Sequence, residues 1–382
     1  MARTLGEREP APTLPQKMLD LNWGLVLLLV CTASVGFAML YSAAGGSLEP
    51  WASRQMMRFA IGLCVTFAIA MVDIRFWRRY AYLAYAVALV LLIAVEVMGV
   101  VGMGARRWVD LGLFQLQPSE VMKIALMLAL ARYFHGLSME DIGRIRWLAV
   151  PAALMFAPAV LVLRQPDLGT ALMLIASGVI ILFVAGVRWW MFAIAGGLAA
   201  AVIPIGYQFL HDYQRDRILT FLNPESDPLG AGYHIMQSKI ALGSGGIFGK
   251  GFIQGTQSHL NFLPEMNTDF IFTMLAEEFG MVGGLALFAL YFLIFAYGYA
   301  ISLRSRNHFG RLLGMGITGI FFLYVFINAA MVMGLVPVVG VPLPLISYGG
   351  TSMMTLLVGF GLLMSVWIHR DVEIPRKSQD DL

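Results

Sequence analysis

Residues 261–280 read NFLPEMNTDFIFTMLAEEFG and join a polar loop to an apolar run that continues to residue 302. Because about 20 apolar residues cross a bilayer, this run predicts a membrane-spanning helix. Asp269 lies at the junction, directly after Thr268, which fits the N-cap position of that helix. The helix dipole alone would stabilise a carboxylate there by ~1 kcal/mol. Because carboxylates at membrane depth are costly, we interpret Asp269 as a functional residue.

The composition predicts a polytopic membrane protein. The chain has 382 residues, of which 59% are hydrophobic and 13% are charged, whereas about a quarter of the residues in a soluble domain are charged. The two cysteines, Cys31 and Cys64, lie inside apolar runs and are interpreted as packing or lipid-facing residues. The six histidines show no metal-binding spacing. The first apolar run is long enough to remain as a helix, so we expect no cleaved signal peptide.

Ten apolar runs have lengths near that of a bilayer crossing, at residues 21–43, 55–72, 78–101, 118–134, 147–164, 167–186, 189–209, 268–302, 311–335 and 347–368. We therefore expect an all-α protein of about ten transmembrane helices. The predicted organisation is a cytoplasmic tail over residues 1–20, a single transmembrane domain over 21–370 and a second cytoplasmic tail over 371–382. An even number of spans places both termini on the same side of the membrane.

The distribution of basic residues predicts which side this is. Short cytoplasmic loops carry an excess of Lys and Arg, and one set of short segments holds Arg75, Arg78, Arg79, Arg144, Arg146, Arg188, Arg304, Arg306, Arg311, Arg370, Arg376 and Lys377. The alternate set holds only Arg54, Arg106, Arg107 and Arg164. Both termini are therefore predicted to be cytoplasmic. The long loop over residues 208–267, between spans seven and eight, then faces outward and is expected to pack on the membrane surface.

Two pairs of charged residues lie near the outer ends of the predicted spans. Each pair has a structural interpretation besides the functional one. Glu120 and Lys123 share one helix face, so they either form a private ion pair or serve the function, which we favour. Arg106 and Arg107 precede Trp108, and interfacial anchoring competes with substrate contact for them.

Further acidic residues divide between structural and functional interpretations. Asp167 follows Pro166 and caps the sixth span, with function an equal alternative. Glu277 and Glu278 are interpreted as buried polar contacts between helices. Glu96 in the third span has no assigned partner.

The outward polar residues favour one kind of chemistry. The glycine-rich stretch over residues 244–251 fails the P-loop pattern, and no dinucleotide fingerprint is present. Those glycines are interpreted as forming tight turns. Arginines suit a diphosphate, and one positioned carboxylate suits a general base acting on a hydroxyl. The sequence contains no nucleophile–histidine pair. A lipid-diphosphate sugar donor and a sugar hydroxyl acceptor would need this combination of groups.

Five motifs occur in an order that resembles the SEDS family of RodA, FtsW and SpoVE proteins. They are GxRRW at 104–108, QPSExxK at 117–123, QPDLGTA at 165–171, FLPExxTDFIF at 262–272 and PLISYGGTS at 344–352. QSHLNFLPE and the short N-terminal tail are most similar to RodA. The resemblance implies a peptidoglycan glycosyltransferase of the bacterial inner membrane. Such an enzyme polymerises lipid II for cell elongation and rod shape, with its active site facing the periplasm.

The resemblance also implies roles for particular residues. Asp269 is the expected catalytic base, and the expected substrate-binding residues are Arg106, Arg107, Glu120, Lys123, Asp167, Lys239, Glu265, Thr268 and Ser347. The family's acidic residue and histidine are replaced by Asn261 and Asn267, so their roles are not transferred. A divalent cation, Mg²⁺ or Mn²⁺, is compatible with the reaction, but the sequence shows no dedicated metal ligands.

The resemblance further implies partners: lipid II, the growing glycan strand, a class B penicillin-binding protein that cross-links it, and the elongation machinery, with no nucleic acid. Two alternatives remain open. A lipid II flippase would distribute polar residues through the membrane, and a non-catalytic scaffold for the penicillin-binding protein would tolerate neutralisation of Asp269.

Overall fold

The computed structural model describes residues 13–102, 105–110, 112, 115–208, 215, 219–221, 223, 231–256 and 266–375. Every predicted span contains one long helix. These helices are α2 (Trp23–Ala43), α3 (Ala52–Met71), α4 (Ile74–Met98), α5 (Pro118–His135), α7 (Ala149–Arg164), α8 (Leu168–Ala185), α9 (Trp189–Gln208), α13 (Ile271–Arg304), α14 (His308–Val332) and α15 (Gly350–Ile368). Shorter helices are α1 (Leu14–Leu19), α6 (Met139–Ile142), α11 (Ala231–Ser244) and the 3₁₀ helix η1 (Ile145–Leu148).

The helical membrane fold predicted from the sequence is confirmed. Within the described residues, eight helices are long and apolar enough to cross a membrane. Helix α5 is not one of these eight, because it carries three charged residues: Glu120, Lys123 and Arg132. Helix α9 is represented only by its shorter apolar part, Trp189–Ala201. The total of ten crossings therefore stays a prediction.

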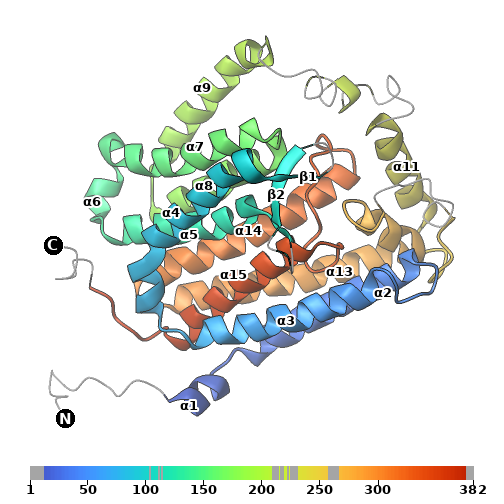
Figure 1. Cartoon of the computed structure of the whole chain (residues 1–382), viewed down its shortest axis with the longest axis horizontal. Coiled ribbons are helices and arrows are strands. Elements are labelled where there is room, and N and C mark those ends of the chain that lie inside the picture. The colour runs from blue at the N-terminus through green and yellow to red at the C-terminus, as the bar shows by residue number, and fades with distance from the viewer. Residues whose placement is uncertain are drawn as a thin grey trace.

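Helix α14 lies at the centre of the bundle. It packs against α5, α8, α13 and α15, and α15 also packs along α3. Aromatic side chains fill this centre, among them Tyr291, Phe321, Tyr324 and Phe360, which are fully buried. Helix α9 diverges from the bundle (Figure 1). Helices α13, α14 and α15 thus supply the aromatic core of the bundle.

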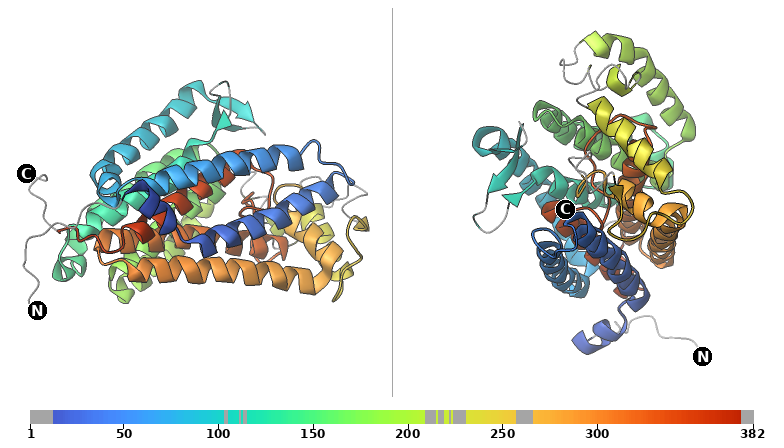
Figure 2. Two further views of the ribbon diagram at one scale, coloured as in Figure 1. Left: turned by 90° about the horizontal axis from the view of Figure 1, so that it is seen from below. Right: turned by 90° about the vertical axis from the view of Figure 1, so that its right-hand side faces the viewer.

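The two ends of the bundle carry different structures (Figure 2). We call the end with α1, α6 and residues 369–375 the terminal end. We call the other end, which carries the β-strands and α11, the hairpin end. Basic residues predicted to be cytoplasmic lie at the terminal end: Arg144 follows α6, and the amide of Arg306 donates to the carbonyl of Arg370 at 2.8 Å.

A small antiparallel sheet replaces the end of the third predicted span, at residues 78–101, and the connection that follows it. Its strands are β1 (Val100–Gly102), β2 (Ala105–Asp110) and β3 (Gln115–Leu116), in the order β1-β2-β3. Gly112, with a φ of 81°, turns the chain between β2 and β3, and its amide donates to Asp110 Oδ1 at 2.7 Å. A positive φ of this size suits glycine. The sheet fixes the position of Arg107 in the middle of β2.

The described part of the predicted outward loop packs on the bundle. Helix α11 lies against the start of α13 and the end of α14. Ser238 Oγ is 2.8 Å from Thr273 Oγ1 and donates to the carbonyl of Val332 at 2.8 Å. These buried contacts attach α11 to the two helices that flank Asp269.

Helix α13 is interrupted, whereas the apolar run over residues 268–302 predicts one continuous helix. Gly280 has a φ of 66° and a ψ of −161°, which is not helical. The turn over residues 245–251 supplies replacement hydrogen bonds, from the amide of Gly251 to the carbonyl of Glu278 at 3.0 Å and from the amide of Met281 to the carbonyl of Gly246 at 3.0 Å. A Cβ at Gly249 would lie 2.1 Å from the carbonyl oxygen of Glu278. The glycine-rich turn therefore docks backbone against backbone at this break.

Candidate active site around Asp269

Asp269 lies in a turn, not in the first turn of α13. The turn covers residues 266–270, and the helix begins at Ile271 with Phe270 as its N-cap, without a side-chain capping hydrogen bond. The prediction that Thr268 caps this helix is therefore wrong. Hydrogen bonds from other segments hold the carbonyls of this turn in a non-helical path. Asp269 is half-buried within it.

Asn328 holds the Asp269 turn through its main chain. Its Nδ2 donates to the carbonyl of Asp269 at 2.9 Å and to the carbonyl of Val341 at 2.7 Å. The Asn328 side chain is fully buried on α14. One amide group therefore joins the turn to the segment over residues 336–349, which precedes α15.

Ser347 attaches the same two segments at a second point. Its Oγ donates to the carbonyl of Thr268 at 2.6 Å and accepts from the amide of Leu343 at 2.7 Å. The amide of Tyr348 donates to the carbonyl of Asn267 at 2.8 Å. Gln55 Nε2 on α3 donates to the carbonyl of Ser347 at 2.8 Å. Ser347, predicted as a substrate-binding residue, thus holds the turn in place.

The 336–349 segment also connects Asp269 with the start of α8. Gly340 has a φ of 69°, and a Cβ there would lie 3.4 Å from Asp269 Oδ2. A Cβ at Gly169 would lie 2.6 Å from the carbonyl oxygen of Val339. Asp167 and Asp269 therefore lie on two sides of the same short stretch of backbone.

Arg107 contacts the connection between α7 and α8. Its Nε donates to the carbonyl of Gln165 at 3.1 Å, and its guanidinium also donates to the carbonyl of Pro166. A third contact, to Asp167 Oδ2, measures 3.7 Å. The Arg107 side chain is 29% exposed. It can therefore order this turn and still meet an anion from the hairpin end.

Asp167 performs the capping role that the sequence predicted. It is the N-cap of α8, and its Oδ1 accepts from the amide of Thr170 at 3.1 Å. The cap and the 3.7 Å contact with Arg107 account for both of its carboxylate oxygens.

Glu120, Lys123 and Tyr324 form a buried cluster. Lys123 Nζ donates to Glu120 Oε1 at 2.7 Å and to the hydroxyl of Tyr324, which donates to Glu120 Oε2. Lys123 is 1% exposed and Glu120 is 5% exposed. Tyr324 precedes Asn328 by one turn of α14. The ion pair considered from the sequence is therefore present, and it extends to the helix that positions Asp269.

Three further residues were predicted as substrate contacts: Lys239, Arg106 and Glu265. Lys239 on α11 lies against Gly334, whose Cβ would meet Lys239 Nζ at 2.8 Å. Arg106 pairs through its backbone with Val101 in the sheet, and its side chain lies outside the described part of the chain. Glu265 lies outside the described residues.

Glu277 and Glu278 have structural contacts. Glu277 Oε1 pairs with Lys250 Nζ at 2.7 Å, and Glu278 Oε1 accepts from Ser42 Oγ on α2. The interpretation of Glu278 as a contact between helices agrees with this geometry, whereas Glu277 contacts the glycine-rich turn. Glu96 lies half-buried in α4.

Sequence reasoning did not identify Tyr324, Asn328 or Gln55. Asn328 and Gln55 are polar residues within apolar spans, and that signal would have marked them as buried hydrogen-bond donors. Their carbonyl acceptors, however, are distant in sequence and follow only from the fold. Within the described ranges, no three His, Cys, Asp or Glu residues gather as metal ligands.

The comparisons with known proteins agree with the fold. Residues 17–372 match the family model described as "Cell cycle protein", which covers FtsW, RodA and SpoVE. The chain is 45% identical to the peptidoglycan glycosyltransferase MrdB of Escherichia coli K12, over 91% of this chain and 93% of MrdB. It is 36% identical to the stage V sporulation protein E of Bacillus subtilis, over 90% and 95%.

Two solved structures are also similar. A chain from a peptidoglycan synthase complex, described for its coordination of polymerization and crosslinking, superposes with a TM-score of 0.80 at 34% identity, over 92% of this chain and 99% of that one. The rod shape determining protein RodA of Thermus thermophilus superposes with a TM-score of 0.71 at 30% identity, over 93% of this chain and 99% of that one.

The fold and site define a multi-span membrane protein with a carboxylate in a turn at one end of the bundle. The chain belongs to the FtsW/RodA/SpoVE family.

Proposed function

We propose that this protein is a peptidoglycan glycosyltransferase that polymerises lipid II into glycan strands for cell-wall elongation and rod shape. The observation that best supports this proposal is the position of Asp269. Its carboxylate is half-buried, and it lies in a turn whose backbone carbonyls accept hydrogen bonds from Asn328 and Ser347. The 45% identity to an enzyme named peptidoglycan glycosyltransferase supports the same function.

Asp269 acts as the general base in this proposal. It removes the proton from the 4-hydroxyl of the acceptor N-acetylglucosamine, and that oxygen attacks the anomeric carbon of the lipid-linked donor strand. The donor bond is α and the product bond is β, so one inverting displacement suffices and undecaprenyl diphosphate leaves. Such a displacement requires a base on the attacking side and positive charge on the leaving side.

Arg107 supplies positive charge for the diphosphate. Its side chain is 29% exposed at the hairpin end, and the guanidinium fork suits phosphate oxygens. Arg106 is its neighbour in β2 and is proposed to assist. A divalent cation, Mg²⁺ or Mn²⁺, is compatible with this reaction, and within the described residues no three His, Cys, Asp or Glu residues gather around one point.

Lys123 is among the expected substrate-binding residues, but its contacts favour a different role. To reach a substrate it would have to leave Glu120 and Tyr324 from a position that is 1% exposed. We propose that the cluster positions α14 and hence Asn328, one turn away. Lys239, Glu265 and Thr268 stay proposed contacts along the path of the strand.

The proposed location is the bacterial inner membrane, with Asp269 facing the periplasm and the terminal end in the cytoplasm. A cysteine in place of Ser47, exposed between α2 and α3, should react with a membrane-impermeant thiol reagent in intact spheroplasts. A cysteine in place of Ser138, exposed at the terminal end, should react only after lysis. The reverse pattern would invert the assignment. Cys31 and Cys64 are both exposed and are first replaced by serine.

The proposed partners are lipid II, the growing strand, a class B penicillin-binding protein and the elongation machinery. The similar chain that belongs to a peptidoglycan synthase complex supports a cross-linking partner. Glycan synthesis that is unchanged by adding the penicillin-binding protein would argue against activation by it.

The purified protein, incubated with fluorescent lipid II, tests the reaction itself. We expect a ladder of glycan strands on a gel, sensitive to a glycan-cleaving muramidase. The same protein in liposomes, with labelled lipid II on one side, tests the alternatives. Translocation without polymer would support a flippase. Absence of both activities, with a partner that polymerises only in its presence, would support a scaffold.

A further inference from the structure

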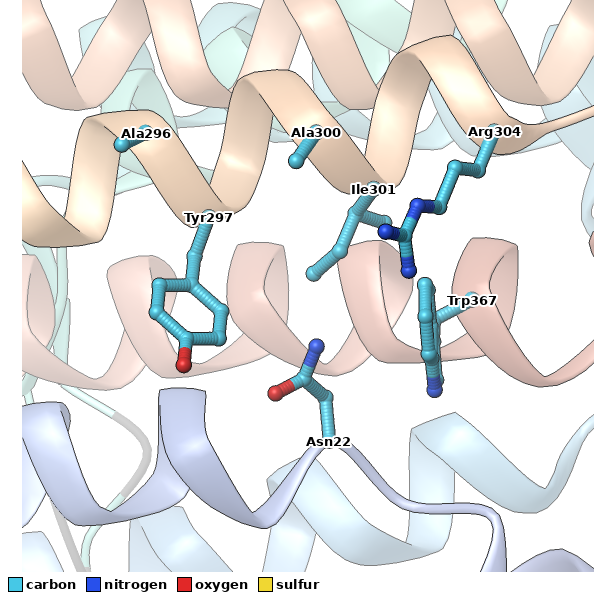
Figure 3. Close-up of a pocket in the computed structure, with 7 residues that line it drawn as sticks. All are labelled: Asn22, Ala296, Tyr297, Ala300, Ile301, Arg304 and Trp367. Atoms are coloured by element: carbon cyan, nitrogen blue, oxygen red, sulfur yellow. The ribbon is translucent and has the colours of Figure 1, made fainter.

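A groove of about 350 Å³ lies at the terminal end, away from Asp269 (Figure 3). It is formed by the last turns of α13, the first residue before α2 and the last turn of α15. Its lining consists of Asn22, Ala296, Tyr297, Ala300, Ile301, Arg304 and Trp367. None of these residues takes part in the proposed reaction.

One wall of the groove is a small-residue strip on α13 that ends in a cation. Ala296, Ala300 and Arg304 are spaced by four residues and therefore share one helix face. At 1.5 Å per residue, the strip runs for about 12 Å along the helix. Tyr297 and Ile301 flank it. The apolar part of this wall, at Ala296 and Ala300, suits a hydrocarbon chain lying parallel to the helix.

The end of the groove is cationic and aromatic. The Arg304 guanidinium carbon lies 5.5 Å from the centroid of the Trp367 ring, and that of Arg370 lies 4.5 Å from it. Arg370 and Arg306 both contact Asp371, at 3.8 and 3.4 Å. Among the residues that the structure describes, no carboxylate pairs with Arg304. Its charge is therefore available to an anion at the mouth of the groove.

Asn22 adds a polar group beside this cation. Its Oδ1 caps α2 by accepting from the amide of Leu25 at 3.1 Å. Figure 3 shows its side chain directed into the gap between Tyr297 and Trp367. Because Oδ1 accepts the capping hydrogen bond, the Nδ2 group is the part of this side chain that can donate to a ligand.

The surroundings of the groove face lipid. Trp23, Leu27 and Leu303 are 53%, 63% and 48% exposed on the helices that border it. In a membrane protein such side chains contact the bilayer, and Trp and Tyr mark the depth of the headgroups. An apolar trough that opens to the bilayer and ends in arginine and tryptophan matches a lipid with a negatively charged headgroup.

We propose that this groove binds an anionic glycerophospholipid of the leaflet at the terminal end. One acyl chain lies along Ala296 and Ala300, and the phosphate meets Arg304 and the amide of Asn22. The bound lipid would hold the ends of α2, α13 and α15 together. The inference requires the membrane-spanning bundle and not the proposed glycosyl transfer.

Lipid retention measured by native mass spectrometry tests the site. The whole protein, delipidated in detergent, is titrated with dioleoyl phosphatidylglycerol or dioleoyl phosphatidylcholine. We expect the wild type to retain the anionic lipid severalfold more than the zwitterionic one. Arg304→Gln should remove most of that preference, and Ala300→Phe should reduce retention of both lipids by filling the trough.

Arg306→Gln is the matched control. Its side chain is 65% exposed near the same surface but does not line the groove, so retention should stay at the wild-type level. An equal loss in the Arg304 and Arg306 variants would reduce the effect to general surface charge and overturn the site. Wild-type retention in Ala300→Phe would also overturn it.

Photo-crosslinking of the wild type gives a second test that does not depend on the folding of a variant. A photoreactive phosphatidylglycerol with its reactive group in the acyl chain should label the peptide that contains residues 296–304 above all other lipid-facing helices. Labelling spread evenly over α3, α4 and α13 would contradict a specific groove.

Discussion

Glu120 and Asp269 are both carboxylates at the hairpin end, but the structure holds them in opposite ways. Glu120 is fixed by its side chain, since both of its oxygens contact Lys123 or Tyr324. Asp269 is fixed by its main chain, since Asn328 donates to its carbonyl. The hydrogen bond that positions Asp269 therefore does not consume its carboxylate oxygens. A half-buried carboxylate on a positioned main chain suits a base, and a buried carboxylate whose two oxygens contact Lys123 and Tyr324 suits a structural role.

The largest expected effect is the loss of stability when the buried ion pair between Glu120 and Lys123 is broken. Lys123→Met leaves the charge of Glu120 buried, and removing one partner of a buried pair costs about 3–5 kcal/mol. The free energy of unfolding in detergent should fall by that order. Glu120→Gln combined with Lys123→Met should recover part of the loss, because no uncompensated charge remains.

Lys239→Met is the control for that prediction, because Lys239 is exposed and its loss should leave the free energy of unfolding unchanged. If Lys123→Met instead kept full stability and lost only lipid II use, Lys123 would be a substrate contact and the contrast between the two carboxylates would fail.

The helices could be predicted from the sequence, whereas the turn that holds Asp269 could not. Hydropathy alone located the ten long helices, because burial in lipid dominates the choice of residues along a span. Thr268 and Asp269, however, look like a helix start, and only the fold supplies the Ser347 and Asn328 hydrogen bonds that keep their carbonyls out of the helix. A local pattern cannot reveal a donor that lies 59 residues away.

Two backbone features were missed for a related reason. The strands of the small sheet are short and follow an apolar span, so they have no clear alternating pattern. The break in α13 at Gly280 depends on the docking of the 245–251 turn, whose hydrogen bonds replace those of the helix. Glycine in an apolar run is common in membrane helices, so Gly280 alone did not predict a break.

A smaller effect is expected for Asn328→Leu, which removes the donor shared by the carbonyls of Asp269 and Val341. Each buried carbonyl left unsatisfied costs about 1–3 kcal/mol. Because the Asp269 turn loses its anchor, kcat should fall more than the loss of stability explains, with little change in KM.

Asn307→Ala is the matched control at the other end of the same helix. Asn307 Oδ1 caps α14 by accepting from the amide of Gly310, and loss of such a cap costs about 1 kcal/mol. This variant should lose stability and keep kcat. An equal fall of kcat in both variants would show that α14 acts only through overall stability.

The smallest effect concerns His369, which follows α15 at the terminal end. Burial lowers the pKa of its imidazole below the usual 6.5, so the folded protein binds this proton less readily than the unfolded chain. Stability should therefore decline as the pH falls below about 6.5 towards the lowered pKa. Lys17 and Asp73 face this group with opposite effects. His369→Gln should flatten the dependence of the melting temperature on pH between 8 and 5, and an unchanged slope would contradict this account.

The central claim is that Asp269 is the base, and Asp269→Asn tests it most directly because it keeps the shape and removes the basicity. The measurement is the polymerisation rate of the purified protein with labelled lipid II, together with the binding of lipid II. Asp110→Asn, an exposed aspartate in the sheet at the same end, is the control and should keep the wild-type rate. The account predicts a fall in kcat of about 10²–10⁴-fold for Asp269→Asn, with lipid II binding retained. Polymerisation by Asp269→Asn at the wild-type rate would contradict it.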